Sequence, residues 1–252
     1  MNASCFIPFI SSFDENLIPK NFVSPYCDIH PIAKLATNDL KNKISQLIKI
    51  DLKFKNEYLK TTLNRGKMFG VLVVKNPEGK LGYLGGFSGK IGNSSHFDYF
   101  VPPVVDILEE NISIDSIMSE ISILTKEINI LKAEDKSHSK LKTSIALRKN
   151  KSIALQQNIF NEYNFLNSKR DKKSLKSIFL DFNRDKIPAG AGECAAPILF
   201  QYAFKNNLTP IALAEFWWGI SPKSEIKKHG EFYPPCIAKC EPILDFMLND
   251  LM

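Results

Sequence analysis

Three of the five cysteines lie in two segments where they could bind a metal ion or activate a water. Cys194 follows Glu193 after the glycine-rich segment 188–192, and Cys236 and Cys240 lie four residues apart later in the chain. Residues at this spacing share one face of a helix, so Cys236 and Cys240 can face a single ion. We expect each segment to start a helix, where the helix dipole lowers the pKa of a thiol and favours the thiolate that metals bind.

These cysteines support two interpretations. Cys194, Cys236 and Cys240 with one water would form an open zinc site, the arrangement that supports hydrolysis. In such a site Glu193 is the predicted proton carrier, Glu215 is the alternative, and zinc is the predicted cofactor. In the second interpretation the three cysteines are reduced structural residues that pack at two helix ends.

The composition is that of a globular protein with a mildly basic surface. The 252 residues are 44% hydrophobic and carry a net charge of +6, so the chain can bury a core and can accept RNA or another anionic partner. Five cysteines, an odd number, do not form a disulfide framework, and the reducing cytoplasm is the expected compartment. No window has the ~20 uninterrupted apolar residues of a membrane span, and no basic leader precedes the first apolar run. We therefore expect a cytoplasmic protein with no membrane partner.

Hydrophobic patterning predicts an α/β core made from two separate segments, residues 66–103 and 177–252. In the first segment two β-rich runs flank a turn sequence at 76–80, which is a strong β-hairpin signal. In the second segment a helix, a strand over 211–219 and a final helix that starts at Pro234 follow one another. The predicted order of the core is therefore β-hairpin, helix, strand, helix.

Two further segments complete the predicted organisation. Residues 1–65 form an irregular, proline-rich N-terminal arm followed by one amphipathic helix. Residues 104–176 carry apolar residues at helical spacing with a polar break at 134–139. This pattern predicts a long antiparallel helical hairpin inserted into the core.

The inserted hairpin is basic. From Lys132 to Lys151 it has seven basic residues and two acidic ones, and RNA phosphates would meet such an arm if RNA is the partner. A solvated helix face explains the same charges without any ligand. The candidate RNA-binding residues are Lys132, Lys136, Lys140, Lys142, Arg148, Lys149, Lys151, Lys169, Arg170, Lys172 and Lys173.

The order of elements around the cysteines resembles the cytidine-deaminase fold. In that fold a strand pair precedes a helix that opens with one zinc ligand and a glutamate, and a later strand precedes a helix that opens with two cysteines. The resemblance implies a deaminase-like sheet flanked by helices, with zinc held by Cys194, Cys236 and Cys240. The sequence departs from the family in two places. Ala196 stands where the family has its glutamate, and three residues rather than two separate the paired cysteines.

The chain as a whole also resembles the N-terminal region that precedes the catalytic domain in RluA-like bacterial pseudouridine synthases. Those synthases attack uridine with an aspartate in a His-Arg-Leu-Asp motif, which this sequence lacks. The resemblance implies a role in tRNA or rRNA modification, with a synthase catalytic domain as a possible partner. The matching stretches are 66–74, 82–84, 87–90, 100–104, 188–197, 214–219, 221–225 and 229–244.

Three functions follow from the sequence. The favoured hypothesis is an RNA-associated accessory domain that helps a pseudouridine synthase hold structured RNA and has no isomerase motif of its own. The second is a zinc-dependent, deaminase-like hydrolase that acts on a nucleobase or nucleoside. The third is a structural or dimerising module whose long hairpin mediates contacts.

Overall fold

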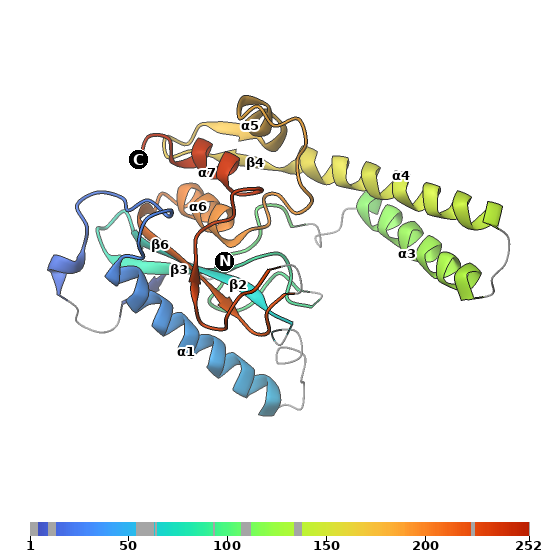
Figure 1. The fold of residues 1–252 in the computed structure, drawn as a ribbon. Helices are drawn as coiled ribbons and strands as arrows, with labels where there is room; N and C mark the ends of the chain where they lie inside the picture. Colours follow the sequence, from blue (N-terminus) through green and yellow to red (C-terminus); the bar gives the residue numbers. More distant parts are fainter. Residues whose placement is uncertain are drawn as a thin grey trace.

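The structure, a computed structural model, is a mixed α/β protein from which a helical hairpin projects (Figure 1). It describes residues 5–9, 14–53, 63, 65–92, 94–106, 112–133, 138–222 and 225–251. The elements are β1 (Ile7–Pro8), the 3-10 helix η1 (Glu15–Leu17), α1 (Pro31–Lys53), β2 (Lys67–Lys75), β3 (Leu81–Phe87), α3 (Ile112–Ala133), α4 (His138–Glu162), β4 (Asn164–Leu166), β5 (Lys172–Ser174), α5 (Leu175–Asp181), α6 (Ala195–Lys205), β6 (Thr209–Trp218), β7 (Phe232–Tyr233) and α7 (Glu241–Leu248).

The main sheet has five strands in the order β1-β3-β2-β6-β7, and each neighbouring pair is antiparallel. β2 and β3 form the predicted hairpin, and β6 pairs with the other edge of β2, where Phe69 lies opposite Phe216. Residues 69–74 of β2 are all buried because helices cover both faces of this central strand. The predicted α/β class is therefore confirmed, as is the order β-hairpin, helix, strand, helix.

Helix α1 covers one face of the sheet and α6 covers the other (Figure 1). Phe69, Val71 and Val73 of β2 belong to the apolar cluster with α1, whereas Leu72 and Val74 belong to the cluster with α6. This division follows from the period of two along a strand, which sends successive side chains to opposite faces.

Two strand glycines let α6 lie close to the sheet. A Cβ atom added at Gly70 would be 2.8 Å from a methyl carbon of Leu199, and one added at Gly86 would be 2.9 Å from Leu199 Cγ. Contacts this short do not occur between real side chains, so a side chain at either position would push the helix away. The glycines therefore set the distance between α6 and the strands β2 and β3.

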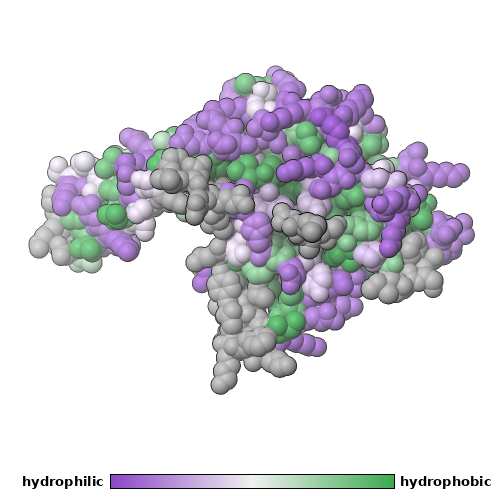
Figure 2. Space-filling view, turned by 180° about the vertical axis from the view of Figure 1, so that it is seen from behind, coloured by the Kyte–Doolittle hydropathy of each residue, from purple (hydrophilic) through white to green (hydrophobic). Residues whose placement is uncertain are grey.

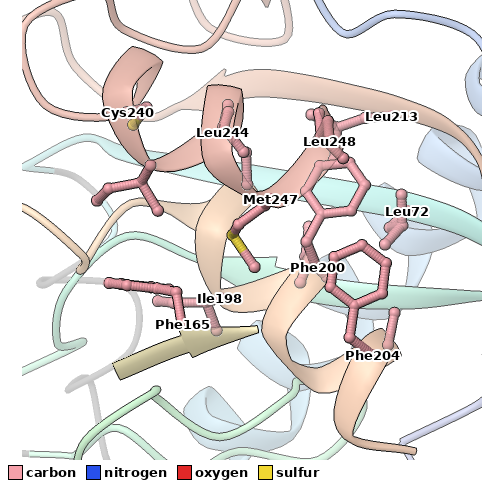
Figure 3. Close-up of a cluster of buried hydrophobic side chains, with 14 of the residues drawn as sticks. Leu72, Phe165, Ile198, Phe200, Phe204, Leu213, Cys240, Leu244, Met247 and Leu248 are labelled. Atoms are coloured by element: carbon pink, nitrogen blue, oxygen red, sulfur yellow. The ribbon is translucent and has the colours of Figure 1, made fainter. Parts of the chain in front are cut away.

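Helices α5 and α7 form a second layer that packs over α6. Figure 3 shows Phe200 and Phe204 of α6 meeting Leu244, Met247 and Leu248 of α7, with Leu72 of β2 beneath them. All of these side chains are buried, and fully burying a large apolar side chain contributes about 1.5–3 kcal/mol. α7, which follows two of the cysteines, is thereby fixed against α6.

The predicted helical hairpin is confirmed as α3 and α4, which pack side by side and extend away from the sheet (Figure 1). Ion pairs from Lys140 to Glu127 and from Lys151 to Glu120 join the two helices. The last part of the segment predicted as hairpin is not helical. Residues 164–174 instead contain the β4–β5 ribbon, which is tied to α6 because the backbone N–H of Leu166 donates to Gln201 Oε1 at 2.9 Å.

Among the helices that the structure describes, none combines the length and apolar character that a membrane crossing requires.

Candidate metal centre

The turn before α6 places Cys194 at the N-terminal end of that helix, as predicted. Cys194 is the N-cap residue of α6, and two glycines with positive φ, Gly190 and Gly192, precede it. A Cβ atom at Gly192 would lie 2.7 Å from the Tyr163 ring, so only glycine allows the chain to pass beneath that ring. The turn therefore places Cys194 two residues before Ala196, whose backbone N–H donates to Glu215 of β6 at 3.1 Å.

The prediction that the last helix begins at Pro234 is wrong. α7 begins at Glu241, with Cys240 as its N-cap residue, and Cys236 lies before the turn that leads into it. Tyr233 pairs with Glu215 of β6, which keeps this segment extended. Tyr233 also precedes a proline, and a residue before proline avoids the helical region of backbone dihedral angles. The backbone N–H of Cys240 still donates to the Cys236 carbonyl at 3.1 Å, so the two cysteines lie one turn apart.

The three predicted ligands come together in the fold. The Sγ atoms of Cys194 and Cys236 are 3.9 Å apart, those of Cys236 and Cys240 are 3.3 Å apart, and all three lie within 4.8 Å of one another. This cysteine cluster is close enough to bind one metal ion. In the part of the chain that the structure describes, no histidine, aspartate or glutamate joins the three as a ligand. Cys240 is buried, Cys194 is half-buried and Cys236 is exposed, so solvent reaches the cluster from the side of Cys236.

Hydrogen bonds within the cluster favour a thiolate at Cys236. Its hydrogen bonds with the sulfurs of Cys194 and Cys240, supported by the backbone N–H groups of Lys239 and Cys240, lower the pKa of Cys236 far below its usual value. The hydrogen bond with Cys236 raises the pKa of Cys194. The hydrogen bond with Cys194 raises the pKa of Cys240. Binding a metal to the cluster would release the thiol protons that it still carries.

An arginine holds the loop between the paired cysteines. Arg184 Nη1 donates to the backbone carbonyls of Ile237 at 3.0 Å and Ala238 at 3.2 Å, and its Nη2 donates to Glu241 Oε2 at 2.7 Å. The planar guanidinium thus joins the loop to the first turn of α7, which fixes the separation of Cys236 and Cys240. A lone arginine far away in the sequence carries no local signal for this role, so the sequence did not reveal it.

A buried carboxyl group lies beside the cluster. Glu215 of β6 is 3% exposed, and burial raises its pKa to about 8, although the Ala196 backbone N–H donates to Oε1 at 3.1 Å. Its charge acts on the thiols of Cys194 and Cys240 and raises their pKa values further. Glu215 is the one charged residue in the otherwise apolar run of β6, a signal that sequence reasoning could have weighted more heavily.

Glu193, the predicted proton carrier, faces different neighbours. Its Oε2 atom is 3.7 Å from the positions where Gly89 and Gly190 would carry a Cβ atom, and its charge acts on Lys67 and Tyr163. Together with Gly89 it lines a cavity of about 30 Å³. The geometry therefore joins Glu215, more closely than Glu193, to the cysteine cluster.

His229 is held in a turn away from the metal ligands. Its Nδ1 atom accepts the backbone N–H of Gly219 at 2.9 Å, and its ring lies 4.4 Å from that of Trp218. Trp217 is buried in the sheet.

Several of the candidate RNA-binding residues already have partners within the chain. Lys140, Lys151, Lys169 and Lys173 form ion pairs with Glu127, Glu120, Asp250 and Asp181, and Arg170 lies over the Phe204 ring. Lys132, Lys142, Lys149 and Lys172 are exposed, and Arg148 is half-buried. Lys136 lies outside the described residues.

Comparisons of the chain with protein-family models, with curated proteins and with solved structures find no match. The chemistry of the site therefore rests on its own residues.

Arg184→Ala should weaken metal binding about 10- to 100-fold, the usual cost of losing a group that orients metal ligands. The loop between Cys236 and Cys240 would lose its three hydrogen bonds to the guanidinium. Titration with Co²⁺, followed by visible absorbance of the thiolate complex, measures the affinity. Arg148→Ala on the hairpin is the matched control, and an equal affinity of both variants would contradict a role for Arg184.

Glu215→Gln should change how stability depends on pH in protein kept metal-free by a chelator. Burial raises the pKa of Glu215 from 4.5 to about 8, so its contribution to stability is present at low pH and is lost as the pH rises through 8. Urea unfolding at pH 6 and pH 9 measures the free energy of unfolding. From pH 6 to pH 9 this free energy should fall by about 1–3 kcal/mol more for wild type than for the variant. A difference between the two proteins that is constant with pH would contradict this prediction.

Proposed function

We propose that the protein is a zinc-dependent hydrolase of deaminase-like architecture that acts on a nucleobase or nucleoside. The observation that carries this proposal is the cysteine cluster with a buried carboxyl group beside it. Zn–S bonds of about 2.3 Å in a tetrahedron place sulfurs about 3.8 Å apart. The separations of 3.9 Å and 3.3 Å lie on either side of that value.

The donor set fits a catalytic zinc better than a structural one. Structural sites use four protein ligands, whereas catalytic sites use three and leave one position open. Three thiols converge here and the Cys236 side faces solvent, so a fourth position is available to water or substrate. A zinc ion in such a site polarises the substrate and lowers the pKa of a coordinated water.

The resemblance to the deaminase fold also supports the proposal. In chain order, α6 with Cys194 at its N-terminus comes after the β2–β3 hairpin, with α3, α4, β4, β5 and α5 in between, and α7 with Cys240 at its N-terminus comes after β6 and the short strand β7. Cytidine deaminases arrange their ligands in the same order. The missing glutamate of that family has a physical substitute, because the backbone N–H of Ala196, its position in this chain, binds the Glu215 carboxylate.

Glu215 would carry protons in this mechanism. A carboxyl group with a pKa of about 8 is protonated in part of the molecules at neutral pH, and it can both accept and return a proton there. The Ala196 N–H fixes one carboxylate oxygen and leaves the other available.

Two variants separate metal binding from catalysis. Cys194→Ser should lower zinc content, measured by mass spectrometry of protein purified without chelators, from about one ion per chain to near zero. Glu215→Gln should retain zinc and lose at least about 100-fold of the activity, as loss of a general acid–base does. Ammonia release from cytosine, cytidine, adenine and adenosine measures that activity.

Cys27→Ser is the matched control, because Cys27 is exposed and lies outside the cysteine cluster. Wild-type protein without stoichiometric zinc would exclude the hydrolase. A Glu215→Gln variant with full activity would leave the metal site standing and remove Glu215 from the mechanism.

A second candidate function is the RNA-associated accessory domain of a pseudouridine synthase. The supporting observation is that α4 has five basic residues and one acidic residue and projects from the body of the protein (Figure 1). Figure 2 shows both hydrophilic and hydrophobic residues on the surface seen from behind, the projecting arm included, so phosphate contacts there would come from single lysines.

RNA binding is tested by filter binding to tRNA and rRNA fragments over a series of salt concentrations. The double variant Lys142→Ala, Lys149→Ala should bind RNA more weakly. The slope of the logarithm of the binding constant against the logarithm of the salt concentration should become shallower by about 1–2, because each phosphate contact releases counterions. Lys151→Ala is the control, since Lys151 is ion-paired with Glu120. Affinity that does not respond to salt, or no binding, would exclude this function.

A further inference from the structure

We propose that Cys236 and Cys240 form a peroxide-reactive dithiol, in which Cys236 reacts with hydrogen peroxide and Cys240 then closes a disulfide bond with it. The disulfide itself requires no metal. Its consequence for metal binding rests on the proposed metal centre, since the same two sulfurs would be ligands there.

The two sulfurs lie closer together than the other measured pair of the cluster. The Sγ atoms of Cys236 and Cys240 are 3.3 Å apart, whereas those of Cys194 and Cys236 are 3.9 Å apart. A disulfide bond is about 2.05 Å long, so the pair formed by Cys236 and Cys240 needs the smaller movement to reach it.

The backbone between Cys236 and Cys240 is an exposed turn, not part of a helix. α7 begins only at Glu241, and Ile237 within the turn is 65% exposed. The N–H of Cys240 donates to the Cys236 carbonyl at 3.1 Å, which holds the two ends of the turn together. Because the turn carries exposed side chains, it can adjust to the geometry that a disulfide requires without moving the packed core.

Cys194, in contrast, is fixed by its helix. It is the N-cap residue of α6, and Ala195 and Ala196 that follow it are fully buried. The N–H of Ala196 is hydrogen-bonded to Glu215 at 3.1 Å. A movement of Cys194 toward Cys236 would disturb these contacts, so the disulfide closes within the turn and not across to α6.

Exposure sets the order of the two steps. Cys236 is exposed and Cys240 is buried, so a reactant from solvent meets Cys236 first. The Cys236 sulfur attacks one peroxide oxygen and the O–O bond breaks, which gives a sulfenic acid and one water. The Cys240 sulfur then attacks the Cys236 sulfur, the S–O bond breaks, and the hydroxyl leaves with the thiol proton as a second water. The two sulfurs together lose two electrons, and the peroxide gains them.

The disulfide and a bound metal exclude each other. The disulfide would leave Cys194 as the only thiol of the cluster, too few ligands for a zinc site. An ion on the three sulfurs would occupy the electron pairs that attack peroxide. Since Cys236 is exposed, thiol or phosphine reductants can reach the disulfide and restore the ligands.

The test treats metal-free full-length protein with hydrogen peroxide and then digests it with trypsin. Lys239 lies between the two cysteines, so cleavage there leaves Cys236 in peptide 229–239 and Cys240 in peptide 240–252. The remaining thiols are blocked with N-ethylmaleimide before digestion. Mass spectrometry should find the two peptides joined, about 2 Da lighter than their sum, and tris(2-carboxyethyl)phosphine should separate them.

Three variants identify the pair. Cys27→Ser, which changes an exposed cysteine outside the cluster, is the matched control and should form the same linkage as wild type. Cys194→Ser should also form it. Cys240→Ser should stop at the sulfenic acid of Cys236, which dimedone traps. A linkage to peptide 187–205, which carries Cys194, or no linkage in wild type would overturn the proposal.

Metal titrations separate this proposal from that of the metal centre. Peroxide-treated protein should not take up Co²⁺, followed by visible absorbance, and reduction should restore the uptake. Saturating Zn²⁺ should slow the linkage at least about tenfold, and an unchanged rate in zinc-loaded protein would overturn the mutual exclusion. Untreated wild type that does not bind Co²⁺ but forms the linkage would overturn the metal centre alone.

Discussion

The close packing of α6 on the sheet is the constraint on which the site depends. Gly70 and Gly86 leave no side chain between the strands and Leu199, so α6 lies directly against β2 and β3. At this distance the N–H of Ala196 reaches the Glu215 carboxylate, and Cys194 reaches the other two sulfurs. A larger residue at either glycine would separate the thiols from the acid.

In the proposed hydrolase the acid comes from a strand, not from the helix that follows the first cysteine. A glutamate two residues after the first cysteine would project from α6, whereas Glu215 reaches the start of α6 from the strand beneath it. Burial on β6 raises its pKa, and the helix N–H orients it. We infer that the deaminase-like order of elements is compatible with acid–base chemistry although Ala196 stands at the family's acidic position.

Much of the fold followed from local sequence patterns. The turn between β2 and β3, the apolar run of β6 and the helical period of α3 and α4 each depend on neighbouring residues, and each prediction is confirmed. The start of α7 and the β4–β5 ribbon were not predicted. Pairing of Tyr233 with Glu215 and the hydrogen bond from Leu166 to Gln201 decide these segments, and both join residues distant in the sequence.

The sequence by itself determined which three thiols are the candidate ligands and that Cys194 lies at the start of a helix, because the turn signals lie within a few residues of that cysteine. Only the tertiary structure decided that the sulfurs converge, that Glu215 and not the adjacent Glu193 lies with them, and that Arg184 holds the loop between two of the cysteines. The physical reason is that these contacts depend on the separation of α6, β6 and α7. That separation is set by the packing of side chains across the sheet, which no local pattern encodes.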